Sequence, residues 1–299
     1  MKNTLLPIFL LLASIAAAQE TTQEISVYGT GGLSTLQYKS AQGKVSLGIG
    51  GGGGVGYTFF FNPQWGFNIG VEVALFNASA SGAAITGSSK EIYDYGRIED
   101  TYFNSTYSDY KEKQRAVYLQ VPLMAQFQTG ADNKFYAAAG VKVGIALAGS
   151  YATTANQLVL SGYFPATEQT FADVPEVGYV SKEHPTTSGE LDFGFNLSLA
   201  AEVGARWRLS GYISLYTGLY VDYGLLNVAP KKTTALVHRP SENLTAFAYN
   251  SLLTATLPAG NYVDKINLFS AGLKVKLSFA INHSNTPPKS KNMKFENEA

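Results

Sequence analysis

Residues 265–281 constrain the fold of this chain most, because their side chains alternate between two chemical types. From Ser270 onward the even-numbered side is small, polar or cationic: Ser270, Gly272, Lys274, Lys276, Ser278 and Ala280. The other side is wholly apolar: Phe269, Ala271, Leu273, Val275, Leu277, Phe279 and Ile281. A side-chain period of two is that of a β-strand. Seven alternate positions at ~3.4 Å per residue span about 40 Å, enough for a tilted strand to cross a bilayer.

The same alternation recurs along the chain and marks further strands. Eight segments carry it: residues 25–39, 45–61, 65–76, 116–128, 135–149, 191–209, 212–226 and 265–281. Antiparallel strands in even number can close without leaving an unpaired edge, and the lipid interior tolerates no such edge. The sequence therefore predicts an all-β fold: a transmembrane antiparallel β-barrel of eight strands in an up-and-down meander, within residues 19–281.

The connections between these segments alternate in length. Residues 62–64, 130–134 and 210–211 form short connections that are rich in turn residues, and residues 40–44 form a fourth. The remaining connections are long, at residues 77–114, 152–190 and 228–264. Short periplasmic turns and long external loops are typical of outer-membrane barrels. We therefore expect both chain ends on the periplasmic side of the bacterial outer membrane.

The two ends of the chain read as segments outside the barrel. Lys2 precedes an apolar run at residues 5–17, and the small residues 16–18 fit a cleavage site. Residues 1–18 are therefore interpreted as a signal peptide. Residues 282–299 contain two prolines and several lysines, and we expect a disordered periplasmic tail.

Composition narrows the class of protein further. The formal net charge is zero, which argues against a nucleic-acid partner. The chain has no cysteine, so neither a disulfide framework nor a lipid anchor on cysteine is expected. Thirty glycines, 19 tyrosines and 17 phenylalanines suit a β-rich wall that meets lipid. No cofactor and no metal site is predicted.

Charged residues fall on the faces that point inward. These are Glu72, Lys142, Glu202, Arg206, Arg208, Asp222, Lys274 and Lys276. A charge that faced lipid would cost about 2–4 kcal/mol at the midplane, whereas charges inside a barrel can pair. The predicted lumen network contains Glu72, Lys142, Glu202, Arg206, Asp222 and Lys274, three acids and three bases. An eight-stranded barrel is filled by its own side chains, so this network is preferred over a gated ion path.

Aromatic residues mark two further features. Trp65 and Trp207 stand beside short turns, where an interfacial aromatic girdle is expected. The first long connection is rich in tyrosine, a side chain that gives binding loops large contact area at low entropic cost. This possible recognition loop contains Tyr93, Tyr95, Tyr102, Tyr107 and Tyr110. The alternatives are that these rings only pack on one another, or that neighbouring acids bind a divalent ion.

Three short motifs carry a family resemblance. The sequence YLQVPLMAQF at residues 118–127 resembles a strand of the PorT-like outer-membrane β-barrel family of Bacteroidetes, and GVKVG at residues 140–144 is similar too. The barrel plan also resembles the membrane half of the OmpA family. In the last strand, Ser270, Gly272, Val275 and Leu277 resemble the signal that the barrel-assembly machinery reads. The resemblance implies an outer-membrane protein inserted by that machinery.

Three functions remain open from the sequence. The first is a non-enzymatic barrel with a structural or surface-recognition role, in contact with outer-membrane lipid and lipopolysaccharide and with an unknown extracellular protein. The second, implied by the PorT resemblance, is an accessory factor for secretion or transport. The third is a hydrolase or acyltransferase at the outer rim, using His184 or His238 as general base, although no matching motif surrounds either residue.

Overall fold

The computed structural model describes residues 22–94, 98–130, 133–239 and 245–281, with the side chains of residues 92–99 left aside. The proposed signal peptide and tail lie outside these ranges and stay predictions. In the described ranges most of the chain is β-strand, which confirms the all-β class. No helix there is long and apolar enough to cross a membrane.

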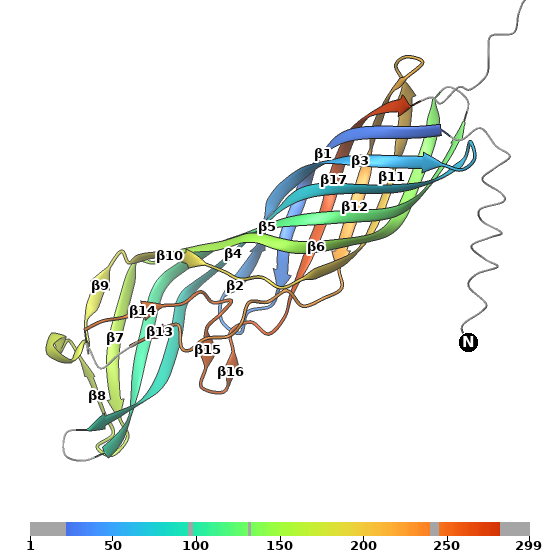
Figure 1. Ribbon diagram of the computed structural model, residues 1–299. Helices are drawn as coiled ribbons and strands as arrows, with labels where there is room; N and C mark the ends of the chain where they lie inside the picture. Colours follow the sequence, from blue (N-terminus) through green and yellow to red (C-terminus); the bar gives the residue numbers. More distant parts are fainter. Residues whose placement is uncertain (1–21, 95–97, 131–132, 240–244, 282–299) are drawn as a thin grey trace, which may run out of the picture.

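The molecule is elongated, and its long strands lie side by side (Figure 1). The long strands are β1 (Thr22–Tyr38), β3 (Ile49–Phe60), β4 (Trp65–Asp94), β5 (Ile98–Gly130), β6 (Lys134–Thr154), β11 (Asn196–Arg208), β12 (Ile213–Gly224) and β17 (Ile266–Ile281). Between them lie β2 (Lys44–Leu47), β7 (Gln157–Phe164), β8 (Gln169–Ala172), the 3-10 turn η1 (Pro175–Val177), β9 (Ser181–Glu183) and β10 (Thr186–Glu190). Short pairs follow in β13 (Val237–His238), β14 (Ala248–Tyr249), β15 (Thr256–Leu257) and β16 (Gly260–Asn261).

The long strands pair antiparallel in chain order, and the pairings return to their starting point. Strand β1 pairs with β3, β3 with β4, β4 with β5, and β5 with β6. Strand β6 pairs with β11, β11 with β12, and β12 with β17. Strand β17 then pairs with β1 over sixteen positions, from Gln23 opposite Ile281 to Tyr38 opposite Ile266. We call this arrangement the strand cycle.

The two ends of the strand cycle differ. One end, the turn end, carries the short connections β3–β4, β5–β6 and β11–β12, together with the start of β1 and the end of β17. The other end, the loop end, carries the extensions of β4, β5 and β6, strands β7 to β10, and residues 225–265 (Figure 1).

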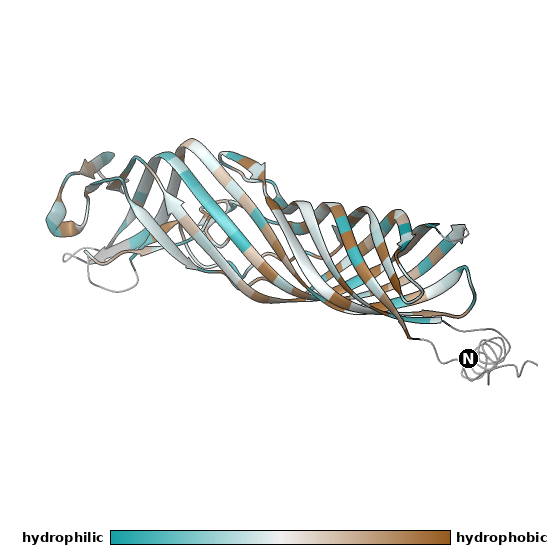
Figure 2. Ribbon diagram, turned by 90° about the horizontal axis from the view of Figure 1, so that it is seen from above, coloured by the Kyte–Doolittle hydropathy of each residue, from teal (hydrophilic) through white to brown (hydrophobic). Residues whose placement is uncertain are grey.

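An apolar belt surrounds the strand cycle. Ile49, Val73, Ile145 and Leu273 expose 79%, 45%, 52% and 65% of their surface, although a soluble protein would bury such side chains. The residues between them face inward and are mostly polar, small or tyrosine, so brown bands alternate with white and teal ones in Figure 2. The strand cycle is therefore apolar outside and holds most of its polar side chains inside, with an apolar interior only toward the loop end, at residues such as Leu36 and Phe76.

The loop end has the opposite arrangement. Strands β4 and β5 continue there as a paired ribbon, β7 joins the edge of β5, and β8 and β9 pair with β7. Residues 225–239 and 245–265 pack against this sheet and bury apolar side chains in its core, among them Leu252, Leu253 and Tyr262, each at most 1% exposed. We call this part the extension.

The strand boundaries predicted from sequence need four corrections. Residues 77–114 are not a loop, because β4 and β5 pair along nearly all of that length. The long connection at residues 152–190 contains most of β7 to β10, and β6 runs on to Thr154. The predicted strand 45–61 is two strands, interrupted at Gly48, where a Cβ would lie 2.0 Å from the Asn77 carbonyl oxygen. The strand expected to begin at residue 191 begins at Asn196.

The inward face changes parity where the strand cycle meets the extension. On β5 the buried side chains are even-numbered from Tyr110 to Gln128 and odd-numbered from Thr101 to Tyr107. The change occurs at Asp109, which has the left-handed φ of 52°. On the neighbouring strand, Asn156 separates β6 from β7 at the same level and donates the hydrogen bond that fixes Asp109. We call this level the joint.

Candidate functional site

The interior of the strand cycle holds a cluster of buried ions. The Lys142 Nζ donates to Glu72 Oε1 at 2.7 Å and to Asp222 Oδ2 at 2.9 Å. The three residues come from β6, β4 and β12, and none is more than 7% exposed. Tyr28 and Ser270 donate their hydroxyls to the same two carboxylates. One ammonium group therefore ties three strands together across the interior.

Two further ion pairs lie in the same interior. Lys274 pairs with Glu202, and its ammonium lies 4.1 Å from the centre of the Tyr28 ring. Nearer the turn end, the Arg206 guanidinium pairs with Glu24 at 2.8 Å. The second Glu24 oxygen accepts the hydroxyls of Tyr216 and Ser278, at 2.9 Å and 2.6 Å.

Lys276 is buried without an acidic partner in the described chain. Its Nζ lies 4.1 Å from the centre of the Tyr216 ring and 3.4 Å from Gln126 Oε1, and the residue is 3% exposed. An aromatic face attracts a cation electrostatically, and this attraction grows when water is excluded.

The six residues predicted to form the network thus lie in one interior, in three contact groups. Sequence reasoning missed Glu24, the partner of Arg206, because it directly precedes residue 25, where the predicted first strand begins. The alternation continues to Thr22, and a longer reading of that strand would have placed Glu24 inward. Arg208 was expected inward but is exposed at the turn end.

The two tryptophans lie on the outer surface at the turn end. Trp65 is 45% exposed and packs against Phe127 with ring centres 4.9 Å apart. Trp207 is 43% exposed, and its indole N–H donates to Thr217 Oγ1 at 2.9 Å. Both are exposed aromatic rings, and Trp207 also has the polar contact that suits a membrane interface. Their girdle role stays a prediction.

The four residues of the expected assembly signal divide between the two faces of β17. Val275 and Leu277 are exposed on the apolar belt, at 52% and 37%. Ser270 is buried and contacts Asp222, while a Cβ on Gly272 would lie 2.1 Å from the Gly31 carbonyl oxygen. The close approach of β1 and β17 therefore requires this glycine, and recognition by the assembly machinery stays a prediction.

Of the three described tyrosine side chains of the expected recognition loop, two are buried. Tyr107 and Tyr110 are 3% and 1% exposed and pack edge to face, with ring centres 5.2 Å apart. The prediction that they present a recognition surface is therefore wrong, because the sheet of the extension needs an apolar core. Tyr102 is partly buried and lies against Tyr163. Tyr95 and the side chain of Tyr93 lie outside the described part of the chain.

Glu112 is a buried carboxylate that sequence reasoning did not select. It is 0% exposed and accepts five hydrogen bonds, two of them from Ser251 Oγ at 2.6 Å and the Leu252 backbone N–H at 3.1 Å. The other donors are Tyr110, Gln114 and Thr153. Glu112 therefore fixes residues 225–265 to β5. The alternation at residues 110–114 indicates a strand with Glu112 on its inward face, but these residues fall in a stretch that the sequence analysis predicts as a loop.

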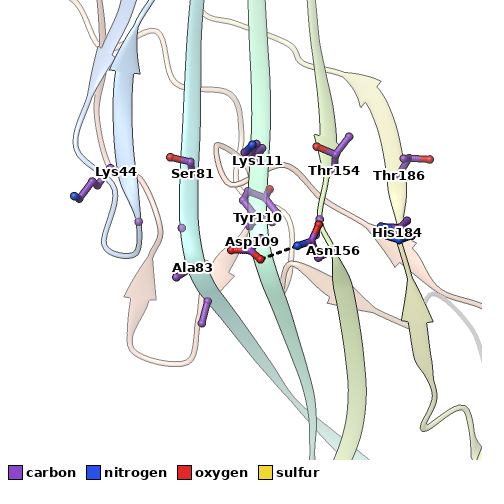
Figure 3. Close-up of a pocket in the computed structure, with 14 residues that line it drawn as sticks. Lys44, Ser81, Ala83, Asp109, Tyr110, Lys111, Thr154, Asn156, His184 and Thr186 are labelled. Atoms are coloured by element: carbon purple, nitrogen blue, oxygen red, sulfur yellow. Dashed lines mark hydrogen bonds between the residues drawn. The ribbon is translucent and has the colours of Figure 1, made fainter.

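Two grooves lie on the outer surface near the joint. The larger, about 960 Å³, passes between Lys44, Lys111, Asp109 and His184 (Figure 3). Within it the Asn156 side chain donates to Asp109 at 2.7 Å, which holds the left-handed turn of the joint. The second groove, about 760 Å³, lies closer to the apolar belt, and its lining includes Lys113, Arg115 and Glu190 among mostly small residues.

Neither histidine is arranged as a general base. The His238 Nδ1 lies 3.3 Å from the Asn250 side-chain nitrogen, and burial lowers the pKa of this imidazole. Neither ring forms an ion pair with an acid of the described residues. Those residues also hold no group of three or more His, Cys, Asp or Glu placed to bind a metal ion.

Comparison with known proteins gives one family. The family model described as an outer membrane protein beta-barrel domain matches residues 17–228. No curated protein matches the chain. The outer-membrane localisation predicted from the sequence is confirmed. The resemblance to PorT-like proteins and the secretion role stay predictions.

Three of the solved structures that match this chain are outer-membrane proteins, each with a TM-score below 0.5. Ail, the attachment invasion locus protein of Yersinia pestis, is 10% identical with a TM-score of 0.31, covering 88% of this chain and 99% of its own. A major outer membrane protein of Thermus thermophilus is 14% identical with a TM-score of 0.38, covering 87% and 99%. OprG of Pseudomonas aeruginosa is 13% identical with a TM-score of 0.35, covering 88% and 97%.

Proposed function

This chain belongs to the outer-membrane β-barrel family, and from that premise we propose that it is a non-enzymatic anchor. The strand cycle is a closed barrel of eight strands that spans the membrane, and its lumen is filled. The extension projects outside the cell as a rigid platform for recognition of another molecule.

The paired ions of the interior carry this proposal. A conducting pore keeps a water-filled lumen, whereas here the charged side chains contact one another and exclude solvent. Lys142, Glu72 and Asp222 are at most 7% exposed. The strand cycle therefore has the properties of a wall element rather than of a channel.

The length asymmetry of the connections supports the proposed orientation. Barrels of the outer membrane carry short turns toward the periplasm and long connections outside. The first strand of the strand cycle begins and its last strand ends at the turn end, whereas the extension lies at the opposite end. The extension would therefore face the cell's surroundings.

The construction of the extension supports a recognition role better than a flexible loop would. Its backbone is held by the β4–β5 ladder, and its core by side chains such as Leu158 and Leu253, both 0% exposed. A preorganised surface loses little entropy on binding, which favours affinity. The outer faces of this sheet, not its buried tyrosines, would contact the partner.

Single cysteines test the orientation, because the native chain has none. Exposed Ser181 and Gln169 lie in the extension, and exposed Gln64 and Ser210 lie at the turn end. A membrane-impermeant maleimide on intact cells should label S181C and Q169C, while Q64C and S210C should react only after the cells are broken. The reverse pattern would refute the proposed orientation.

Conductance tests the filled lumen. The purified protein in planar lipid bilayers should give only small and rare current steps. Large, stable channels from the unmodified protein would contradict the role as an anchor and would favour transport.

A further inference from the structure

A row of cations stands on the outer surface directly above the apolar belt. Lys111, Lys113 and Arg115 occupy alternate positions of β5, and all three are exposed. Two residues of a strand span about 6.8 Å, so this spacing separates the charged groups along one line. The next outward residue toward the turn end is Val117, where the apolar belt begins.

The strand register extends the row sideways. Ser81 on β4 lies opposite Lys111 and also opposite Lys44 on β2, which is exposed. Lys44 and Lys111 therefore flank one small residue at the same height. We call Lys44, Lys111, Lys113 and Arg115 the cation row.

Small side chains surround the cation row and leave it accessible. Lys113 is opposite Ser79 on one side and Ala152 on the other, and Arg115 is opposite Asn77 and Ser150. This choice of residues produces the two grooves, of about 960 and 760 Å³, that the four cations line. The floor of the grooves combines hydroxyl groups with the apolar surface of glycine and alanine residues.

No ion pair among the described residues includes any of the four cations. Two acids line the same grooves: Asp109 accepts the hydrogen bond from Asn156, and Glu190 on β10 lies opposite Ser150, one strand away from Arg115. The four cations outnumber these two acids, so the grooves keep a net positive charge. Lys90, farther out on β4, pairs with Asp100.

Exposed apolar side chains continue below the cation row. The Ile49 carbonyl accepts a hydrogen bond from Asn77, so Ile49, which is 79% exposed, adjoins the level of Arg115. Ile145 and Leu147 on β6 are 52% and 55% exposed. One face of the barrel thus presents cations, then hydroxyl groups, then hydrocarbon within a short distance.

We propose that the cation row is a binding site for the phosphorylated glycolipid of the outer leaflet. Phosphate groups would pair with the lysines and with the Arg115 guanidinium, which can donate two parallel hydrogen bonds. The acyl chains would lie over Ile49 and the outer side chains of β6. The inference rests on the orientation given under Proposed function.

The cation row lies at the level expected for the lipid headgroups, and this position favours a lipid ligand over a protein partner. Headgroups form the layer that touches the barrel just above its apolar belt, so a lipid phosphate reaches these cations without displacing anything. A protein partner would have to enter that layer. Basic residues at this position attract anionic lipid by about 1 kcal/mol each, which is roughly a fivefold gain in affinity per cation.

The test compares two variants that lose the same charge. The first is K111Q/K113Q/R115Q, and the matched control is K90Q/K231Q/K265Q, three exposed lysines outside the cation row. Folded protein in detergent is titrated with diphosphoryl lipid A, with the same lipid lacking both phosphates, and with inorganic phosphate, and bound lipid is counted by native mass spectrometry.

The native protein and the control should bind diphosphoryl lipid A equally. The row variant should bind it on the order of a hundredfold more weakly, from three cations at about fivefold each. The dephosphorylated lipid should bind weakly to all three proteins. Equal affinity of the row variant and the control for diphosphoryl lipid A would overturn the proposal, and saturation by inorganic phosphate alone would replace the glycolipid with a free anion site.

The heat-dependent gel mobility of each variant shows whether the barrel has folded before binding is measured. The cysteine labelling described above distinguishes a wrong orientation from a wrong lipid site. If labelling places the extension in the periplasm, the proposed orientation fails. If labelling is as expected and lipid A affinity does not depend on the row, only this inference fails.

Discussion

The strand cycle and the extension solve opposite packing problems with the same strands. In the strand cycle, polar residues such as Lys142 face inward and apolar residues such as Val73 face lipid. In the extension, Phe103 and Leu160 face inward and are at most 1% exposed. The solvent outside decides which pattern is stable, because hydrocarbon accepts no unpaired charge and water favours burial of apolar groups.

At the joint the inward face changes from one set of alternate residues to the other. A regular strand cannot exchange its faces, because alternate side chains always point to opposite sides. Asp109 makes the exchange on β5 with its left-handed φ of 52°, and the break at Asn156 makes it between β6 and β7. The two regions therefore differ in packing but remain one continuous sheet. Four predictions test this comparison.

The largest effect is expected in the interior of the strand cycle. K142M would leave Glu72 and Asp222 buried without their cation, and breaking such a buried pair costs about 3–5 kcal/mol. The urea midpoint of unfolding in detergent should fall steeply. The matched control K90M, which opens the exposed pair with Asp100, should leave that midpoint in place. An unchanged midpoint in K142M would mean that water or ions compensate the charges of Glu72 and Asp222, as in an open channel.

The next effect belongs to the extension. E112A would leave the Ser251 hydroxyl and the Leu252 N–H without their acceptor, and a buried unpaired group costs about 1–3 kcal/mol. Residues 225–265 should then be cut by protease at lower concentration, while the barrel stays resistant. E190A, which removes an exposed acid from β10, is the control. Equal cutting of both variants would show that the apolar core alone holds the segment.

A smaller effect is expected at the joint. A left-handed conformation costs a residue with a β-carbon about 1–2 kcal/mol, and a β-branched side chain fits it worst. D109V should therefore lower the unfolding midpoint, whereas D109G should lower it less, since glycine adopts this φ freely. Both variants lose the hydrogen bond from Asn156, so the difference between their unfolding midpoints reports the cost of the left-handed backbone conformation at residue 109. The opposite order would exclude a left-handed Asp109.

The sequence predicted the strand cycle well because lipid imposes one rule on every strand that crosses it. Residues 269–281 show that rule at every position, and the inward ions followed from it. The extension obeys no single rule: its strands lie in water, exchange faces at Asp109, and carry small residues such as Ala84 and Ser88. Glu112 and the burial of Tyr107 depend on that exchange and on the packing of residues 225–265, neither of which local alternation contains.

The smallest effect concerns His238, at the surface of the extension. The Asn250 side-chain nitrogen also donates to the Ala235 carbonyl at 2.7 Å, so the His238 Nδ1 must act as acceptor, which only a neutral imidazole can do. Burial lowers the pKa of this ring below the 6.5 of an unfolded chain. As the pH falls through the interval just below 6.5, the open segment takes up a proton that the folded segment lacks, so opening becomes easier.

Hydrogen exchange at β13 and β14, corrected for the intrinsic effect of pH, should therefore show lower protection at about pH 5 than at about pH 7. H238N should remove this difference, because asparagine does not titrate. H184N is the matched control, since His184 already has a left-handed φ of 47°, which asparagine tolerates, and the variant should keep the pH dependence. If both variants keep it, a group other than His238 controls the opening, and the pH response no longer distinguishes β13 and β14 from the rest of the extension.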